Sequence, residues 1–358
     1  MEKRRKRSPW PLALLFRLIV IVSAAALAIS YLSVYVNPSV VSFTLFFGLY
    51  FIPLVILNLF ILLAGIIRRT GAVWITFITL LPAILFAELF VRWGEVTPGN
   101  EGTPLKVCTY NVGLFSQGVD NNYEKSFTGI KEFLNTQKAD IVCLQEFYIQ
   151  DTTSIAAHFP QYPYFNYHLF RGRRGWHFGN LTLSKHPITH KGEITFKGST
   201  NLATYTDIDF YGKKIRIYNS HLESHSISFT SLIKKMRESE KVTNEIYEVH
   251  DKVAGTFRKR ATQVDVILNH SANSQYPAII CGDLNDTPMS YTYHRLVSER
   301  KDSFRQSGKG FSATYSLLWP LLRIDYILYP EPFWSKSHTT PRIEYSDHYP
   351  VVSELIIP

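Results

Sequence analysis

Hydrophobic positions divide the chain into two parts with different patterns. In residues 1–94 they form long and nearly continuous runs at about residues 10–36, 43–67 and 72–91. Each run has about 20 residues or more, which is enough for a helix to cross the hydrocarbon core of a bilayer. The sequence therefore predicts an N-terminal membrane region with three transmembrane helices.

Basic residues indicate how these three helices would be oriented. The segment MEKRRKR precedes the first run, and Arg68 with Arg69 fills the second connection, whereas the first connection contains no Lys or Arg. A cleavable signal peptide would account for the first run but not for the next two. Since cytoplasmic loops are enriched in Lys and Arg, the N-terminus and Arg68 are expected in the cytoplasm. Three crossings would place the rest of the chain outside the cytoplasm, on the periplasmic or extracellular face.

Beyond a short linker the pattern changes to alternating strands and helices. Residues 95–104 (EVTPGNEGTP) are rich in Gly, Pro and Thr, which is typical of an extended linker. Residues 105–113 and 139–147 are short apolar segments typical of strands, and residues 127–137 have apolar side chains at helical spacing. This βαβ pattern begins a second predicted domain, residues 105–358.

Further strands are predicted along the rest of this domain. Because the strands are many and the helices few, the pattern excludes a doubly wound parallel fold. We therefore predict an α/β fold in which two mixed β-sheets pack as a sandwich. The further strands are expected at residues 179–185, 204–211, 214–222, 277–285, 323–329 and 350–357.

The longest helical pattern lies in an insertion at about residues 226–268. Its apolar side chains recur at helical spacing, with Lys, Arg and Glu on the opposite face. Two interpretations stay open. The insertion is either a helical flap that packs on its own sandwich, or a membrane-surface element in which Lys234, Lys235 and Arg237 meet anionic headgroups. The apolar positions are Phe229, Leu232, Ile233, Met236, Val242, Ile246, Val249, Val253 and Phe257.

Charge and cysteine content change this picture little. The formal net charge is +9, but residues 1–100 contribute +6 of it, so the high pI does not argue for nucleic-acid binding. Cys108, Cys143 and Cys281 all fall within predicted strands. That placement favours free buried thiols over a disulfide.

Polar side chains recur where the predicted strands end. In IICGDLNDTP, residues 279–288, an apolar run ends at Asp283, Asn285 and Asp286. Each such residue alone has an ordinary explanation, such as a turn, a histidine satisfied in the core or a structural ion pair. Their recurrence along the whole domain indicates a functional site, because side chains converge where rigid strands end. The other candidates are Asn111, Gln145, Glu146, His221, Asp325, Asp347 and His348.

Six motifs carry a family resemblance. In chain order they are TYNVG, QE, NSHLES, GDLN, RIDYIL and SDHYPV. Together they resemble the endonuclease/exonuclease/phosphatase (DNase I-like) superfamily of divalent-metal phosphoesterases, over about residues 105–358. The resemblance implies a hydrolase with a four-layer sandwich, two packed mixed β-sheets flanked by helices, and a site at one end of the sheets. The three predicted transmembrane helices would make this chain a membrane-anchored member.

The resemblance also implies a metal site. Glu146 would be the principal Mg²⁺ ligand, with Asn111 and Asp347 beside it. Oxygen ligands without cysteine suit a hard cation, so Mg²⁺ is expected and Mn²⁺ is an alternative.

The remaining motif residues would act on the phosphoryl group. Asp283 would orient or deprotonate the attacking water, and Asn285 would hold a phosphate oxygen. His348, paired with Asp325, would stabilise the phosphorane-like transition state, and His221 would donate to a non-bridging or leaving oxygen. Such a set is suited to a phosphodiester, whose negative charge grows as water attacks it.

The substrate is inferred from one motif and from the expected membrane tether. NSHLES is similar to the corresponding stretch in sphingomyelinase-type and inositol-phosphatase branches of the superfamily. We favour a phosphodiester in a lipid headgroup, sphingomyelinase-like or lipid-anchor-related, because the domain is expected to be tethered to the bilayer outside the cytoplasm. The basic and aromatic tract at residues 171–180 is either a solvated loop or a rim that binds substrate phosphate.

Three alternatives to this substrate stay open. The first is an extracytoplasmic metal-dependent nuclease. The second is a phosphomonoesterase of the inositol-phosphate type, although GDLNDTP and RIDYIL lack the aromatic and Arg residues of that branch. The third is a catalytically silent, membrane-tethered binding module, which the presence of Glu146, Asp283 and His348 disfavours.

Overall fold

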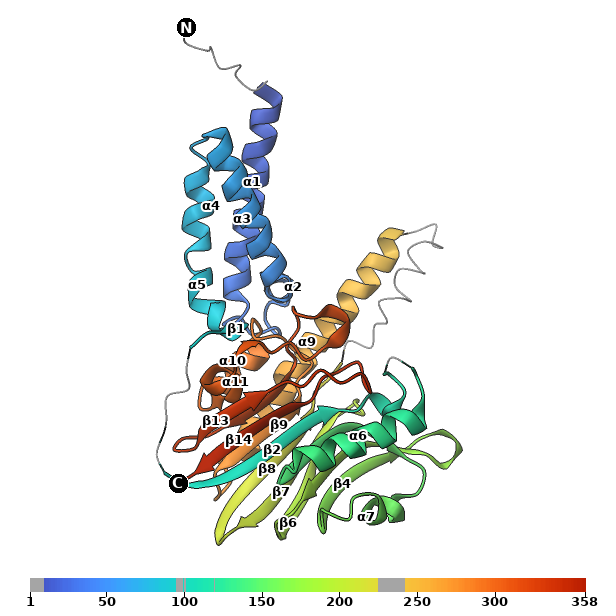
Figure 1. The fold of residues 1–358 in the computed structure, drawn as a ribbon. Helices are drawn as coiled ribbons and strands as arrows, with labels where there is room; N and C mark the ends of the chain where they lie inside the picture. The colour runs from blue at the N-terminus through green and yellow to red at the C-terminus, as the bar shows by residue number, and fades with distance from the viewer. Residues whose placement is uncertain (1–9, 95–98, 100, 119, 225–241) are drawn as a thin grey trace. The chain divides into compact units, whose positions relative to one another are not determined.

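The computed structural model describes the 358-residue chain except for residues 1–9, 95–98, 100, 119 and 225–241 (Figure 1). The chain forms two compact units. The N-terminal unit comprises Met1–Glu88 with Met289–Tyr291, and the second unit comprises Leu89–Pro288 with Thr292–Pro358.

The N-terminal unit is a small bundle of apolar helices. Within it α1 contacts α2, α3 and α4, and α3 also packs against α4. Asn58 of α3 is buried, and its Nδ2 donates to the carbonyl oxygen of Ser23 in α1 at 3.2 Å. Ser23 Oγ donates in turn to Asn58 Oδ1 at 3.3 Å, so two hydrogen bonds join these helices. The helices are α1 (Trp10–Leu32), α2 (Phe43–Leu49), α3 (Phe51–Arg68), α4 (Val73–Leu80), α5 (Ala83–Phe86) and the 3₁₀ turn η1 (Ala87–Leu89).

The structure supports two of the three predicted spanning helices. In the described residues, two helices are long and apolar enough to cross a membrane, α1 and α3. The second predicted span, 43–67, is divided at Tyr50 between α2 and α3. The third, 72–91, is divided into α4, α5 and η1, and its apolar helical part is Val73–Leu89. Pro82 explains the second division, because it has no N–H to continue the helical hydrogen bonds of α4.

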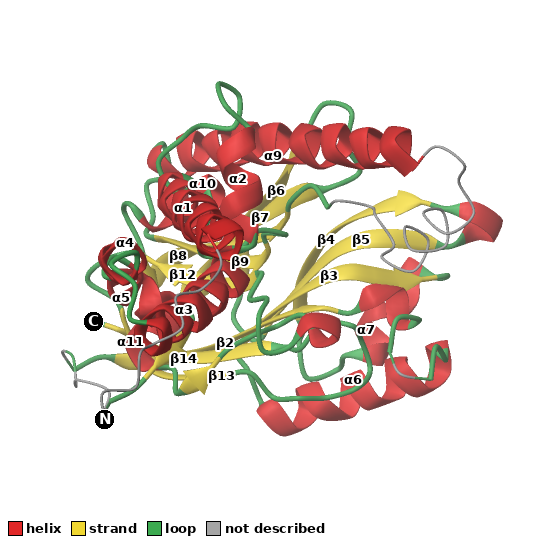
Figure 2. Cartoon of the chain, turned by 90° about the horizontal axis from the view of Figure 1, so that it is seen from above, coloured by secondary structure: helices red, strands yellow, loops and turns green. Residues whose placement is uncertain are grey.

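The second unit is built on two six-stranded mixed sheets. Figure 2 shows α6 and α7 on one side of the sandwich and α9 on the other. This arrangement confirms the predicted sandwich of two mixed sheets flanked by helices. The first sheet has the order β13 (Trp334–Thr339), β14 (Val351–Ile357), β2 (Thr103–Asn111), β3 (Ile141–Ile149), β5 (His177–Ser184), β4 (Tyr164–Arg171). The second has the order β10 (Lys301–Asp302), β12 (Asp325–Tyr329), β9 (Ala278–Asp283), β8 (Lys213–His221), β7 (Leu202–Phe210), β6 (Ile188–Thr195).

Smaller elements complete this unit. A two-stranded sheet pairs β1 (Val91–Arg92) with β11 (Gly310–Phe311). The longer helices are α6 (Tyr123–Gln137) and α9 (Val242–Ala272). The shorter ones are α7 (Ile155–His158), α10 (Tyr291–Val297), α11 (Ser303–Ser307), η2 (Gly113–Phe115), η3 (Thr152–Ser154), η4 (Arg173–Gly175) and η5 (Ser316–Leu318).

The main core lies between the two sheets. It includes Val107 and Ile141 from the first sheet and Ile217, Ile279 and Ile327 from the second, all fully buried. A second core forms where α6 covers the outer face of the first sheet. The three cysteines are buried and free, as the sequence predicts.

Helix α9 is the described part of the insertion after β8. Residues 225–241, which contain the predicted apolar positions Phe229 to Met236, lie outside the described residues. On α9, Val253 and Phe257 are buried, so this half of the insertion packs on its own domain.

Each sheet contains one parallel pair, and this pairing positions the site. β2 runs parallel to β3 in the first sheet, and β8 runs parallel to β9 in the second. The register places Asn111 opposite Gln145 and His221 opposite Asp283. Since the carboxyl ends of parallel strands lie at the same edge of a sheet, the strand ends Asn111, His221 and Asp283 are available to one site. Gln145 lies within β3, opposite Asn111.

Candidate active site

Glu146 leaves the regular ladder of β3. The pairing of β3 with β5 shifts register between Leu144 and Phe147, and Glu146 has a φ of 50°. A non-glycine residue in this region is uncommon and needs support from its surroundings. The bulge turns Glu146 out of the ladder within β3, near Asn111 at the end of β2, and its side chain is 25% exposed.

Asn111 links the two sheets at this edge. Its Nδ2 donates to Asp283 Oδ2 at 2.9 Å and to Glu146 Oε1 at 3.3 Å. Its Oδ1 accepts a hydrogen bond from the Gly113 backbone N–H at 3.0 Å, which fixes the amide orientation. Residues from β2, β3 and β9 therefore meet at one point.

Asp283 is buried at the centre of the group. Its Oδ1 accepts a hydrogen bond from the Asn285 N–H at 2.8 Å, and its Oδ2 accepts one from Asn285 Nδ2 at 3.2 Å. Asn285 has a φ of 52° and also donates to the Leu222 carbonyl at 2.9 Å. Burial and the Asp325 carboxylate raise the pKa of Asp283, which makes it a better proton acceptor near neutral pH.

His221 faces the same carboxylates. Its Nε2 lies 3.7 Å from Glu146 Oε1 and 3.8 Å from Asp283 Oδ2, and this buried nitrogen makes no hydrogen bond to the described residues. Burial lowers the pKa of His221 despite the nearby Asp283, so the ring is neutral at neutral pH. Nε2 is thus available to a ligand.

His348 and Asp325 form a buried ion pair. His348 Nδ1 and Asp325 Oδ2 are 2.9 Å apart, and His348 Nε2 lies 3.8 Å from Asp283 Oδ2. Burial alone would lower the pKa of His348, but the Asp325 and Asp283 carboxylates raise it to about 10. The imidazole is therefore a cation throughout the neutral pH range.

Asp347 lies in the segment before β14. Ser346, its neighbour, donates from Oγ to the Asn111 carbonyl at 2.8 Å, which ties this segment to the end of β2. In the amide orientation that matches donors to acceptors, Gln117 donates to both Asp347 oxygens at 2.9 and 3.1 Å. Burial and the nearby Glu146 and Asp283 carboxylates raise the pKa of Asp347 against the opposing effect of His348.

These carboxylates fit a divalent cation. Glu146 and Asp347 repel each other electrostatically, and Asn111 holds its amide between Glu146 and Asp283. A hard cation with oxygen ligands would relieve that repulsion. Glu146 and Asp347, with the Asn111 amide beside them, are therefore the residues that would hold it.

A second grouping of possible ligands lies close by. Asp283, Asp325 and His348 each place one potential ligand atom within 4.8 Å of the others. A protonated imidazole cannot ligate a metal, and Nδ1 of His348 is already bound to Asp325. We therefore interpret these three residues as a protonated histidine with two carboxylate partners, beside the metal position.

Buried polar side chains next to the site join the two sheets by hydrogen bonds. Gln145 Nε2 donates to Asn219 Oδ1 at 2.7 Å and to Thr109 Oγ1 at 3.0 Å, so the two sheets are joined by side-chain hydrogen bonds. Asn180 donates to the Asn219 carbonyl at 2.9 Å. Gln145, which lies within β3, therefore contributes to this link between the sheets.

Several neighbours of the site are not apparent from the sequence. The ring of Tyr315 lies 5.4 Å from that of His348, and burial together with Asp347, Asp283 and Glu146 raises the pKa of Tyr315. Gln117 is the second such residue. Both lie in loops without periodicity, so no sequence signal marks them.

Asp286 has a structural partner. Arg260 of α9 is fully buried, and its Nε lies 3.7 Å from Asp286 Oδ2. Asp286, the second carboxylate of GDLND, thus anchors the insertion helix to the loop after β9.

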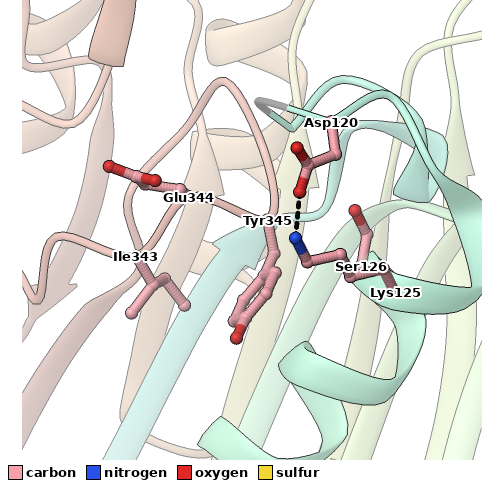
Figure 3. Close-up of a pocket in the computed structure, with 6 residues that line it drawn as sticks. All are labelled: Asp120, Lys125, Ser126, Ile343, Glu344 and Tyr345. Atoms are coloured by element: carbon pink, nitrogen blue, oxygen red, sulfur yellow. Dashed lines mark hydrogen bonds and ion pairs between the residues drawn. The ribbon is translucent and has the colours of Figure 1, made fainter.

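A cavity of about 260 Å³ lies beside the Asp347 segment (Figure 3). None of the eight predicted site residues lines it. An ion pair between Asp120 and Lys125 closes one side. The cavity is therefore separate from the strand-end cluster. Its lining residues are Asp120, Lys125, Ser126, Ile343, Glu344 and Tyr345.

Solved structures with the same fold extend over most of this chain. The endonuclease/exonuclease/phosphatase from Beutenbergia cavernae is 17% identical, with a TM-score of 0.53, over 71% of this chain and 72% of that one. A humanized D. rerio TDP2 is 19% identical, with a TM-score of 0.52, over 71% and 99%. The human Nocturnin catalytic domain with bound sulfate anion is 17% identical, with a TM-score of 0.50, over 70% and 94%. At these identities the similarity establishes the fold.

Family comparisons divide the chain as the structure does. Residues 13–89 match a family described as Domain of unknown function (DUF8431). A search of curated proteins returned no match. Residues 108–348, which contain all eight predicted site residues, match the Endonuclease/Exonuclease/phosphatase family. The chain therefore belongs to the Endonuclease/Exonuclease/phosphatase family and is a phosphoric ester hydrolase of a typically metal-dependent class.

Proposed function

We propose that this protein is a membrane-anchored, Mg²⁺-dependent phosphodiesterase whose substrate is a lipid headgroup. The observation that carries the proposal is the meeting of Asn111, Glu146, His221, Asp283 and His348 at one end of two sheets, each within 4 Å of at least one other. Hydrolysis of an anionic diester uses groups of these kinds: carboxylates, an amide, a neutral imidazole and an imidazolium.

The protein's own residues have separate tasks in this proposal. Asp283, whose pKa is raised, orients the attacking water and accepts its proton. The His348 imidazolium, held by Asp325, stabilises the charge that develops on the phosphoryl oxygens. His221 donates from Nε2 to a non-bridging or leaving oxygen, and Asn285 holds a phosphate oxygen.

The metal would be held by Glu146 and Asp347 beside Asn111. A divalent cation there supplies positive charge to the phosphoryl group and polarises it for attack. Mg²⁺ fits these oxygen ligands best, and Mn²⁺ is the alternative.

The N-terminal unit is proposed to be the membrane anchor. Helices α1 and α3 are long and apolar enough to span, and Val22, Phe60, Ile67 and Leu85 are 66–81% exposed. Such exposure of large apolar side chains suits contact with lipid. We propose that Val73–Leu89 completes a third crossing, because its helices at about 1.5 Å per residue approach the thickness of the hydrocarbon core.

This arrangement predicts the side of the membrane on which the catalytic unit lies. Three crossings with Arg68 and Arg69 inside place the C-terminus outside the cytoplasm. A reporter fused after Pro358 is expected to be active only in the extracytoplasmic compartment. Cytoplasmic reporter activity would instead indicate two crossings and remove the argument against an intracellular substrate.

A substrate panel separates the candidate functions. Full-length protein in lipid nanodiscs is expected to release the headgroup of a phosphodiester lipid faster than it cleaves single- or double-stranded DNA or RNA at equal phosphate concentration. Preferred cleavage of nucleic acid would favour the extracytoplasmic nuclease. Release of inorganic phosphate from inositol phosphates would favour the phosphomonoesterase. No turnover of any substrate would favour the silent binding module.

A further inference from the structure

A short apolar loop is exposed beside the site. Within residues 316–321, which we call the apolar loop, Leu317 is 72% exposed, Leu318 45% and Trp319 39%. The guanidinium of Arg342, itself exposed, lies 3.7 Å from the centroid of the Trp319 ring. Exposed apolar side chains that lie together often mark an interaction site. The apolar loop, with an exposed cation beside it, is therefore a candidate binding surface.

The apolar loop is fixed rigidly to the catalytic machinery. The backbone N–H groups of Thr314 and Tyr315 both donate to the Leu322 carbonyl, at 2.9 and 3.1 Å, and close the loop at its base. The Ser316 N–H donates to the Asp347 carbonyl at 2.8 Å. The Tyr315 ring lies 5.4 Å from the His348 ring. The base of the loop therefore adjoins the active site, while Leu317 and Leu318 extend from it into solvent.

The chain enters the catalytic unit near this loop. β1 (Val91–Arg92) pairs with β11 (Gly310–Phe311), and Arg323 donates to the Leu89 carbonyl at 3.0 Å. These contacts fix the first residues after the apolar segment Val73–Leu89 against the catalytic unit. Three residues lie between Phe311 and Tyr315, which are therefore at most about 14 Å of extended chain apart. The point at which the chain enters the catalytic unit is therefore close to the base of the apolar loop.

A bilayer interface is the partner that matches this chemistry. Tryptophan is enriched at membrane interfaces because its ring is apolar and its N–H is polar, and leucine side chains enter the acyl region. An arginine at the same position can meet an anionic headgroup while its stem covers apolar surface.

We propose that Leu317, Leu318 and Trp319 insert into the bilayer interface and present lipid headgroups to the active site. The proposal rests on the proposed lipid substrate and anchor. It assigns the apolar loop a role in substrate access, and it makes a lipid in the membrane a better substrate than the same diester in solution.

Fluorescence quenching tests insertion without reference to activity. Leu317→Cys would be labelled with an environment-sensitive dye in the full-length protein, which is feasible because Cys108, Cys143 and Cys281 are buried. In nanodiscs of brominated lipid, we expect the emission at this position to be quenched more strongly than at a control position that stays in water, because bromine atoms on the acyl chains would be close to the dye. The matched control is Tyr211→Cys, since Tyr211 is 76% exposed in the turn before β8, at the opposite end of that strand from His221.

Equal quenching at positions 317 and 211 would overturn the proposal. If the loop instead docks on a second copy of the chain, the lipid should not quench the dye, and its emission should change only when the protein concentration is raised. That result would also overturn the proposal. Either outcome leaves the proposed hydrolysis untouched, because the readout is independent of turnover.

A kinetic test separates access from chemistry. Leu317→Ser with Leu318→Ser should lower turnover of the bilayer lipid by about tenfold while leaving hydrolysis of soluble bis-p-nitrophenyl phosphate unchanged. Tyr211→Ser should change neither rate. The role of the loop would be contradicted if the double substitution lowered both rates equally, or if it changed neither rate. If the wild type hydrolyses the soluble diester but no lipid, the proposed substrate is wrong, and the quenching result still decides insertion.

Discussion

Asp283→Asn is expected to lower kcat for any accepted diester by at least about a hundredfold, with little change in KM. The substitution keeps the size of the side chain but removes the proton acceptor. It also places an amide against Asn111 and Asn285, both of which donate to Asp283 Oδ2 in the native protein. The measurement is steady-state hydrolysis of bis-p-nitrophenyl phosphate by the full-length protein in detergent.

The control for this prediction is Asp251→Asn. Asp251 lies on α9 with a side chain 86% exposed, so its substitution removes the same charge away from the site. Asp251→Asn should turn over at the native rate. Near-native kcat for Asp283→Asn, with circular dichroism showing a folded protein, would leave the family assignment intact but remove Asp283 from the mechanism.

His348→Ala should reduce kcat by a similar factor of at least about a hundred, because it removes the cation that faces the phosphoryl group. His250→Ala is a suitable control, since His250 is 48% exposed on α9. A kcat near the native value for His348→Ala in folded protein would show that charge stabilisation comes from elsewhere.

The pH profile tests the partner of His348. The pKa of His348 is raised to about 10, so the imidazolium is present below that pH and is lost above it. Asp325→Asn removes the largest attraction holding the proton, so the pKa should fall and the alkaline limb of kcat should move to lower pH. An alkaline limb that stays in place in Asp325→Asn would assign that limb to another group.

The sequence predicts interior strands well and edge strands poorly. β2, β3, β5, β7, β8, β9, β12 and β14 were expected, and each has two neighbours in its sheet. The unexpected strands β4, β6, β10 and β13 are the four edges. An edge strand is partly solvated, so its side chains lack the continuous apolar run that marks a buried strand.

The same reasoning explains what the sequence indicates about the site. Asn111, Glu146, His221 and Asp283 stand where an apolar run stops, which is visible without structure. Tyr315 and Gln117 reach the site from loops, and Arg260 from the middle of a helix, so their proximity depends on contacts between distant segments. The division of the third predicted span was missed for a related reason. Composition records apolar length but not the local break at Pro82.

A Mg²⁺ titration of diester hydrolysis by the wild type and Glu146→Gln tests the central claim most directly. The substitution removes one ligand charge while keeping the shape of the side chain. The account predicts that a chelator abolishes hydrolysis of bis-p-nitrophenyl phosphate by the full-length wild type and that Mg²⁺ restores it. Half-maximal activity of Glu146→Gln should require at least about tenfold more Mg²⁺, roughly 1.4 kcal/mol of lost binding. Activity that persists in chelator, or superimposable titration curves for the two proteins, would contradict a metal-dependent mechanism centred on Glu146.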